Sequence, residues 1–164
     1  SKGAFYHYFA SKEEVFKAVV RYFYESQMFI NFAEMPNDTL KAFYTAYIDN
    51  FHRLYQEYKE IYQTLNVSGF IMTASLKLPD FIEIQERSNR RELAYWQQAV
   101  TNGRKRAEIN AALPDEIIAA LFVSICKGIL LNKGSCSYKN HDEFIAALTT
   151  HLVALYQLVQ AAPC

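Results

Sequence analysis

Apolar residues recur three and four positions apart along most of the chain, and this spacing is clearest in the segment after Pro36. One face of an α-helix has that spacing, because side chains three and four apart stack on the same side. Most of the apolar positions in this segment are aromatic, so the buried face is unusually rich in rings. We predict a helix here whose apolar face is formed by Leu40, Phe43, Tyr44, Tyr47, Phe51, Leu54, Tyr55 and Tyr58.

Further segments show the same helical spacing and are separated by proline, glycine or polar residues. A capping box of Ser11 and Glu14 starts the first long helix at Lys12. Asn37 or Asp38 is expected to cap the helix that follows Pro36. We predict an all-α chain with additional helices at 12–33, 67–78, 81–101, 114–132 and 141–160.

Glycine and basic residues mark the end of the long polar helix at 81–101. Gly103 is expected to stop this helix, because glycine readily adopts the left-handed conformation that follows a helix C-terminus. The three basic residues 104–106 then lie where positive charge complements the helix dipole. We interpret this basic cluster as a solvated helix end.

The last two predicted helices are apolar on more than one side. One of them also carries a row of small residues at steps of four, which permits close approach of another helix. Two interpretations are open: the wide bands are buried within one chain, or a second copy of the same helix pair covers them. The second predicts a homodimer whose interface contains Ile117, Ala120, Leu121, Ser124, Ile125, Gly128, Leu148, His151, Leu152 and Leu155.

The aromatic residues concentrate before residue 100 and exceed what a core of this size needs. Pockets for small molecules between helices are mostly apolar with a few polar anchors, and tyrosine supplies both a ring and a hydroxyl. The alternative is that these rings only fill the core. As candidates for a pocket wall we select Phe43, Tyr47, Phe51, Tyr55, Tyr62, Phe70, Met72 and Trp96.

Composition allows a single domain with a substantial core, since the 164 residues are 51% hydrophobic and 21% charged. The net charge of zero argues against nucleic-acid binding by the whole surface, although a local patch would suffice. The three cysteines show neither a disulfide framework nor zinc-ligand spacing, which favours the reducing cytoplasm. We expect no bound metal or cofactor and no membrane association.

Enzymatic function finds little support in the sequence. The chain lacks a G-x-S-x-G nucleophile motif, a phosphate-binding glycine-rich loop and an H-E-x-x-H metal pair. The histidines are not spaced with acids in a way that indicates a catalytic group. We therefore expect a non-enzymatic protein.

The opening segment SKGAFYHYF has two different faces if it is helical. Phe5 and Phe9 share one stripe with Ala4 and Tyr8 at its edges, and the other face carries Lys2, Gly3, Tyr6 and His7. Apart from tyrosines, the only titratable side chains before Glu13 are Lys2, His7 and Lys12. A surface of positive or neutral donors suits a phosphate backbone, whereas the alternative is a frayed terminal helix packed on its neighbours.

This segment, together with the following SKEEVF, resembles the end of the DNA-binding domain of TetR-family transcriptional regulators over about sixteen residues. The resemblance implies that residues 1–20 are the C-terminal part of a helix-turn-helix head whose upstream helices precede Ser1, and that 21–164 form a helical ligand-binding and dimerisation domain. It also implies a repressor that releases palindromic operator DNA when a small hydrophobic or amphipathic effector binds.

The resemblance assigns DNA contacts residue by residue. Lys2, Gly3, Ala4, Tyr6 and His7 would face bases in the major groove, and Ser1, Tyr8 and Lys12 would contact phosphates. Ala4 departs from the polar residues of some relatives, which weakens the case for base reading there. The competing hypothesis is a helical dimeric module that binds a small molecule or a partner protein without reading DNA.

Overall fold

The structure is a computed structural model that describes residues 8–25, 30–60, 66–134 and 138–161. Within these ranges the secondary structure is helical, with one isolated antiparallel bridge between Ile109 and Gln160 and no strand. This confirms the predicted all-α class. The helices are α2 (Lys12–Glu25), the 3-10 helix η1 (Phe32–Glu34), α3 (Leu40–Glu57), α5 (Val67–Lys77), α6 (Phe81–Lys105), α7 (Asp115–Gly134) and α8 (His141–Val159).

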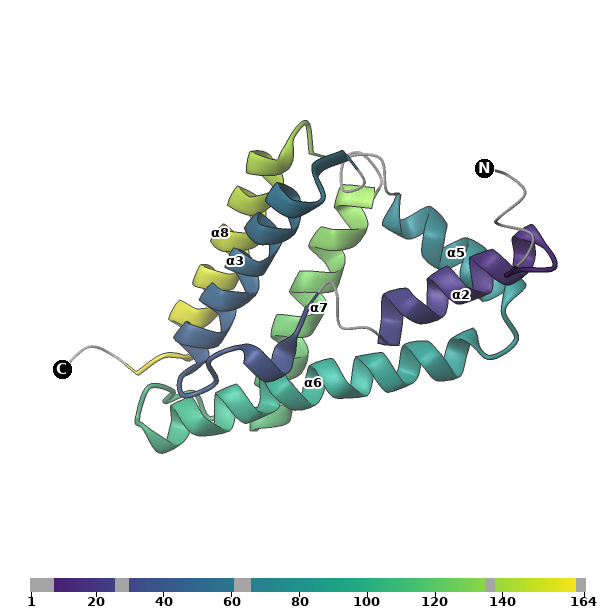
Figure 1. The fold of residues 1–164 in the computed structure, drawn as a ribbon. Helices are drawn as coiled ribbons and strands as arrows, with labels where there is room; N and C mark the ends of the chain where they lie inside the picture. Colours follow the sequence, from purple (N-terminus) through teal and green to yellow (C-terminus); the bar gives the residue numbers. More distant parts are fainter. Residues whose placement is uncertain (1–7, 26–29, 61–65, 135–137, 162–164) are drawn as a thin grey trace.

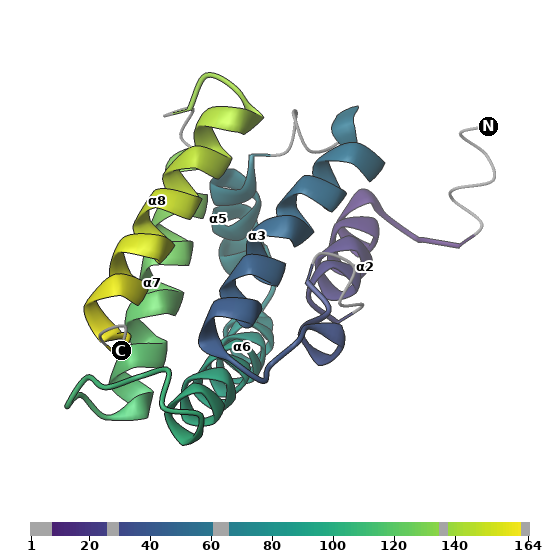
Figure 2. The ribbon, with the colours of Figure 1, turned by 90° about the vertical axis from the view of Figure 1, so that its left-hand side faces the viewer.

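The longest helix, α6, runs along one side of the molecule and packs against most of the other helices (Figure 1). Toward its C-terminal end, α7, α3 and α8 rise from it as a three-helix group. Toward its N-terminal end, α2 and α5 pack on it, and the turned view in Figure 2 again shows α2 apart from α8. The fold therefore has a larger bundle and a smaller unit that share α6.

The core of the larger bundle is built around the aromatic face of α3. Phe43 and Tyr47 are fully buried there, together with Trp96 of α6 and Phe122 of α7. The Trp96 ring lies 4.8 Å from Phe43 and 5.1 Å from Phe122, measured between ring centroids. Burying one such side chain contributes about 1.5–3 kcal/mol, so this cluster stabilises the bundle strongly. The predicted buried face of α3 is confirmed, with Tyr55 and Tyr58 half-buried at its end.

A second, smaller cluster attaches α2 to α5 and α6. Val20 of α2 is fully buried against Ala74, Leu78 and Phe81. The ring of Tyr24 meets that of Phe81 at 5.5 Å in an edge-to-face arrangement. The apolar positions of α2 are therefore used to hold it against the N-terminal end of α6.

The first long helix is shorter than predicted. The pattern predicted a helix over 12–33, but α2 ends at Glu25, and Ile30 and Asn31 are not helical. Phe32 instead begins η1, and its ring stacks on Tyr95 at 5.6 Å and on Phe43 at 6.4 Å. Tertiary contacts of one aromatic side chain thus override the local helical pattern.

The helix starts agree only in part with their predicted caps. The capping box is confirmed, because Ser11 Oγ accepts from Glu14 N–H at 3.1 Å and Glu14 accepts from Ala10 N–H at 2.7 Å. The cap of α3 was predicted wrongly: Thr39, whose hydroxyl accepts from the N–H of Ala42 at 3.1 Å, takes that place. Asp38 instead pairs with Arg106 at 3.1 Å, on the turn beyond α6.

The predicted stop at Gly103 is also wrong, since α6 continues to Lys105. The left-handed residue beyond its end is Ala107, with φ of 59°. The space beside Gly103 is occupied: a Cβ at this position would lie 2.4 Å from the Oε2 atom of Glu108, so the carboxylate would have to shift. The remaining predicted helices α5, α7 and α8 agree with the structure to within about two residues, the usual uncertainty of helix ends.

Candidate functional site

A cavity of about 470 Å³ lies where the larger bundle meets the smaller unit. Its walls come from α2, η1, α3, α5, α6 and α7, so it sits at the junction on which both parts depend. One side is apolar and partly aromatic. The residues of this side include Phe32, Tyr47, Phe51, Leu54, Ile71 and Leu130.

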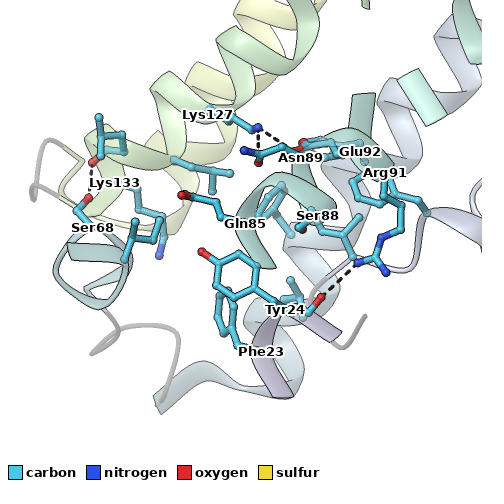
Figure 3. Close-up of a pocket in the computed structure, with 18 residues that line it drawn as sticks. Phe23, Tyr24, Ser68, Gln85, Ser88, Asn89, Arg91, Glu92, Lys127 and Lys133 are labelled. Carbon is cyan, nitrogen blue, oxygen red and sulfur yellow. Dashed lines mark hydrogen bonds and ion pairs between the residues drawn. The ribbon is translucent and has the colours of Figure 1, made fainter. Parts of the chain in front are cut away.

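The opposite side of the cavity is polar and is formed mainly by α6. Gln85, Ser88, Asn89 and Glu92 lie at successive helical spacings of three, one and three residues, so they form one stripe on this helix. Arg91 borders the stripe. Figure 3 shows this polar row facing the space between the helices. A cavity with apolar walls and a limited set of polar groups is the usual form of a small-molecule site.

A carboxylate and an ammonium group are paired at one edge of the cavity. Glu92, with 14% of its side chain exposed, lies 3.5 Å from the Nζ atom of Lys127. Lys127 also donates to the Oδ1 atom of Asn89 at 2.8 Å. Burial raises the pKa of Glu92, and the charge and hydrogen bond of Lys127 partly offset this rise. The opposite charges of Glu92 and Lys127 therefore largely neutralise each other in the cavity wall.

The last turn of α2 is both a wall of the cavity and a tie to α6. Arg91 donates a hydrogen bond to the backbone carbonyl of Tyr24 at 3.3 Å. Burial raises the pKa of the Tyr24 hydroxyl to about 12, so the group stays neutral and can donate a hydrogen bond at physiological pH. One turn earlier, Arg21 pairs with Asp80 at 2.6 Å. Movement of α2 would thus change the shape of the cavity, and a change in the shape of the cavity would move α2.

Lys133 brings a further positive charge to the apolar side. It lies in the last turn of α7, and its ammonium group is 5.7 Å from the ring centroid of Phe144. Burial lowers the pKa of Lys133, which means that its charge is incompletely solvated. In Figure 3, Lys133, Gln85 and Tyr24 reach toward the same space from three different helices.

Of the described residues that we predicted to line a pocket, two line this cavity, Tyr47 and Phe51. Phe43 and Trp96 lie behind Tyr47 in the core, where Trp96 approaches the Tyr47 ring to 5.3 Å. For these two residues the alternative of core filling holds. A buried ring that lines a cavity and a buried ring that packs only against other side chains have the same helical spacing. The sequence therefore does not distinguish them.

The other selected residues lie elsewhere. Tyr55 stacks on His141 at 4.1 Å, and Phe70 packs against Phe16 at 5.9 Å in the smaller unit. Met72 is 67% exposed on the surface. Tyr62 lies outside the described residues. The structure therefore has a cavity in this region, and the other described candidates lie outside its lining.

The polar side of the cavity was not predicted from the sequence. The available signal was the stripe of Gln85, Asn89 and Glu92 at helical spacing between the buried positions Ile84 and Trp96. A polar stripe that continues a buried apolar face indicates a wet or ligand-lined interior. Lys127 and Lys133 interrupt the apolar band of α7 in the same way.

The predicted DNA contacts are described for two residues only. Tyr8 is 84% exposed, and Lys12 is exposed at the start of α2. Ser1, Lys2, Gly3, Ala4, Tyr6 and His7 lie outside the described residues. The described pair is thus accessible, as a contact to a macromolecule requires.

The residues predicted to form a dimer interface divide into two groups. Ile117 and Leu121 are 45% and 40% exposed on α7, and Ser124, Gly128 and His151 are exposed as well. The rest contribute partly or fully to the core of the chain. Ala120 and Ile125 are half-buried, while Leu148, Leu152 and Leu155 are buried against the chain's own helices and offer little or no surface to a second copy.

Comparison of the chain with protein-family models, with curated proteins and with solved structures finds no match in any of the three. None of the described helices combines the length and apolar character needed to cross a membrane. In the same part of the chain, no group of three or more His, Cys, Asp or Glu side chains is placed to hold a metal ion. What the site's geometry offers is a cavity for a small organic molecule, contacted by α2.

Proposed function

We propose that this protein is a one-component transcriptional regulator, acting as a repressor, that releases operator DNA when a small hydrophobic or amphipathic molecule enters the cavity. The observation that carries this proposal is the position of Phe23 and Tyr24, which belong to α2 and line the cavity. Helix α2 directly follows the segment that resembles a TetR recognition helix. A ligand would therefore touch the helix that connects the proposed DNA-binding segment to the core.

Release of DNA requires that the ligand bind one orientation of α2 better than the other. A ligand with equal affinity for both orientations would not change their populations. The polar attachments of α2 suit such a shift, whereas the buried contact of Val20 with Leu78 and Phe81 holds the helix to α5 and α6 and has to be kept or repacked. The pair of Arg21 with Asp80 is 55% and 40% exposed, and pairs of this kind contribute roughly 0–1 kcal/mol. The hydrogen bond from Arg91 to Tyr24 joins the same two helices beside the cavity. Contacts of this strength can be exchanged at small cost.

The proposed regulator acts as a homodimer through α7 and α8. Ile117, Leu121 and Leu131 are exposed along one side of α7, and Leu158 is 80% exposed on α8, which packs on it. A two-fold pair of subunits suits a palindromic operator, because the protein and DNA symmetries then coincide. The proposed DNA contacts remain those of the sequence analysis, with Lys12 contributing its charge and the N-terminus of α2 to a phosphate.

The alternative is a dimeric helical module that binds a small molecule without reading DNA. The cavity favours this alternative as much as it favours the regulator, because it lies wholly outside the opening segment. The two functions differ in what Tyr6 and Lys12 do: they contact DNA in the regulator and only pack or stay solvated in the module.

The deciding experiment measures DNA binding by the product of the complete gene. Its own promoter region and random DNA of equal length are compared across a salt series, with Tyr6→Ala and Lys12→Ala beside the parent protein. We expect a preference for the promoter that both substitutions weaken, with the salt slope falling by about 1 for Lys12→Ala because one phosphate contact is lost. The matched control is Lys105→Ala, an exposed lysine at the opposite end of α6 from α2. Equal binding to random DNA would contradict the regulator and leave the ligand-binding module.

A further inference from the structure

We propose that the cavity binds an amphipathic organic acid, whose anionic group is held by Lys133, Gln85 and Tyr24 while its apolar body lies against the aromatic and aliphatic wall. This inference rests on the proposed function, because it specifies the chemical class of the effector. Three features of the cavity carry it: its charge balance, its converging hydrogen-bond donors and its two-sided polarity.

The charge balance of the cavity favours an anion. Among the described lining residues, three are basic, Arg91, Lys127 and Lys133, and one, Glu92, is a carboxylate. Glu92 is paired with Lys127 at 3.5 Å, and the formal charges of the described lining residues sum to a positive value. Electrostatic interactions are stronger in a partly buried, low-dielectric site than in water. A ligand cation would therefore be repelled, and a ligand anion would be attracted.

Three donors converge on one part of the cavity from three different helices. Lys133 of α7 offers an ammonium group, Gln85 of α6 an amide N–H and Tyr24 of α2 a hydroxyl, and Figure 3 shows them reaching into a common space. Donors of this kind form charge-assisted hydrogen bonds with a carboxylate or a similar oxyanion. A bound anion would also compensate the desolvation that lowers the pKa of Lys133.

The rest of the cavity calls for an apolar body. Phe32, Phe51, Leu54 and Leu130 form a wall that offers no hydrogen-bonding side chain, and the total volume of about 470 Å³ fits a small organic molecule. A free inorganic anion would leave this wall in contact with water. Because Tyr24 belongs to α2, the anionic group of an acid bound here would contact the helix that connects the proposed DNA-binding segment to the core.

The test compares three probes that share one alkyl chain: dodecanoate, dodecanol and dodecyltrimethylammonium. Binding to the whole chain is measured by calorimetry below the micelle concentration and by the fluorescence of Trp96, the only tryptophan, whose ring lies 5.3 Å from the cavity residue Tyr47. We expect dodecanoate to bind at least about tenfold more tightly than dodecanol, because charge-assisted hydrogen bonds exceed neutral ones. Dodecyltrimethylammonium should bind most weakly.

Variants test whether the preference for dodecanoate over dodecanol depends on Lys133, Gln85 and Tyr24. In Lys133→Met, dodecanoate should fall to the affinity of dodecanol while dodecanol binds as before, which also shows that the cavity remains folded. Tyr24→Phe and Gln85→Leu should each reduce only the binding of dodecanoate. Lys105→Met, which removes an exposed charge at the C-terminal end of α6, should change none of the affinities.

Several results would overturn the proposal. Dodecanol binding as tightly as dodecanoate, a preference that survives in Lys133→Met, or failure of all three probes to bind would each show that the cavity does not select an amphipathic acid. Promoter binding, measured separately, distinguishes this failure from failure of the regulator. If dodecanoate binds as expected but leaves promoter affinity unchanged, the ligand class stands and the effector role falls.

Discussion

Single side chains hold together segments that are distant in the sequence, and Glu108 is the clearest case. Its carboxylate accepts hydrogen bonds from the backbone N–H groups of Leu40 at 2.8 Å and Lys41 at 2.9 Å, and from the hydroxyl of Tyr156 at 3.0 Å. The first N–H groups of a helix have no partner within it and favour a negative charge. Burial, together with the hydrogen bond and charge of Glu108, raises the pKa of Tyr156 to about 12. One carboxylate thus joins the start of α3 to α8.

We expect Gly103→Ala to destabilise the fold, although alanine favours a helix over glycine by about 1 kcal/mol. The new Cβ would lie 2.4 Å from Glu108 Oε2 and would push the carboxylate away from the N–H of Leu40. Losing a charged hydrogen bond costs about 1.5–3 kcal/mol, so the net change should be a loss of roughly 1 kcal/mol. Urea unfolding measures it.

The matched control for this substitution is Gly128→Ala in α7, where an added Cβ meets nothing within 4 Å. Within one chain only the helix propensity changes, so this variant should be as stable as the parent chain or more stable when both are compared as monomers. Stabilisation by Gly103→Ala to the same extent would show that Glu108 moves aside at no cost.

At the scale of the elements, the connection between α6 and α7 is fixed by Arg104. Its guanidinium group pairs with Asp115 at 2.7 Å and donates to the backbone carbonyls of Ala111 at 2.9 Å and Leu113 at 2.8 Å. Thr101 adds a hydrogen bond to the same carboxylate at 2.8 Å. The basic cluster after the long helix was interpreted as a solvated helix end, but its first residue instead organises the turn into α7.

This clamp predicts a pH dependence of stability. Burial alone would raise the pKa of Asp115. The hydrogen bonds from Arg104 and Thr101 and the positive charge of Arg104 outweigh burial and lower this pKa below its ordinary value of 3.8. The stabilisation is therefore complete above the unfolded-state pKa and is lost as the pH falls through the lower pKa of the folded state. Asp115→Asn should cost about 1–2 kcal/mol at pH 7, allowing for the partial exposure of Arg104, and the difference from the parent should shrink below about pH 4.

The measurement is urea unfolding of both proteins between pH 7 and pH 3. Asp142→Asn serves as the control, because Asp142 is also an acid in the first turn of a helix but is exposed. It should lose less stability than Asp115→Asn. A difference between Asp115→Asn and the parent that stays constant down to pH 3 would contradict the role given to Arg104.

The sequence predicted the helices well where their periodicity is long and their ends carry local signals. The face of α3 and the capping box at Ser11 are of this kind. At the boundaries that it missed, Phe32 leaves the helical pattern and stacks on Tyr95, 63 residues along the chain, and α6 continues through Gly103 to Lys105. No local pattern contains this information.

At the scale of the whole molecule, the cavity could be predicted in its region but not in its lining. Aromatic content indicates that rings are buried, whereas the position of α2 and α5 against α6 decides which of them border empty space. Tyr47 and Trp96 are both fully buried on neighbouring helices, yet only Tyr47 lines the cavity. The charged side, with Glu92 and Lys127, arises only when α6 and α7 are brought together.

The exposed side of α7 and α8 predicts self-association of the whole chain. Three apolar side chains on this side are exposed to 45%, 40% and 58%: Ile117, Leu121 and Leu131. Contact of a group of apolar side chains with water is unfavourable, and such patches mark interaction sites. If they form the centre of a two-fold interface, Leu121→Lys places two like charges close to the symmetry axis and removes apolar contact. An interface hot spot contributes 2 kcal/mol or more, so the dissociation constant should rise at least about 30-fold. Sedimentation equilibrium over a concentration series measures this.

The control for self-association is Leu76→Lys, since Leu76 is 82% exposed on α5 and does not belong to the exposed apolar side of α7 and α8. This variant should associate like the parent, because it adds the same charge on a surface that the two-fold interface does not use. If Leu76→Lys dissociates the protein and Leu121→Lys does not, the interface lies on the α2–α5 side. The cavity and α2 would then face the second subunit, and the effector would act across the interface. A parent chain that is monomeric at every concentration would instead remove the symmetry argument for palindromic DNA.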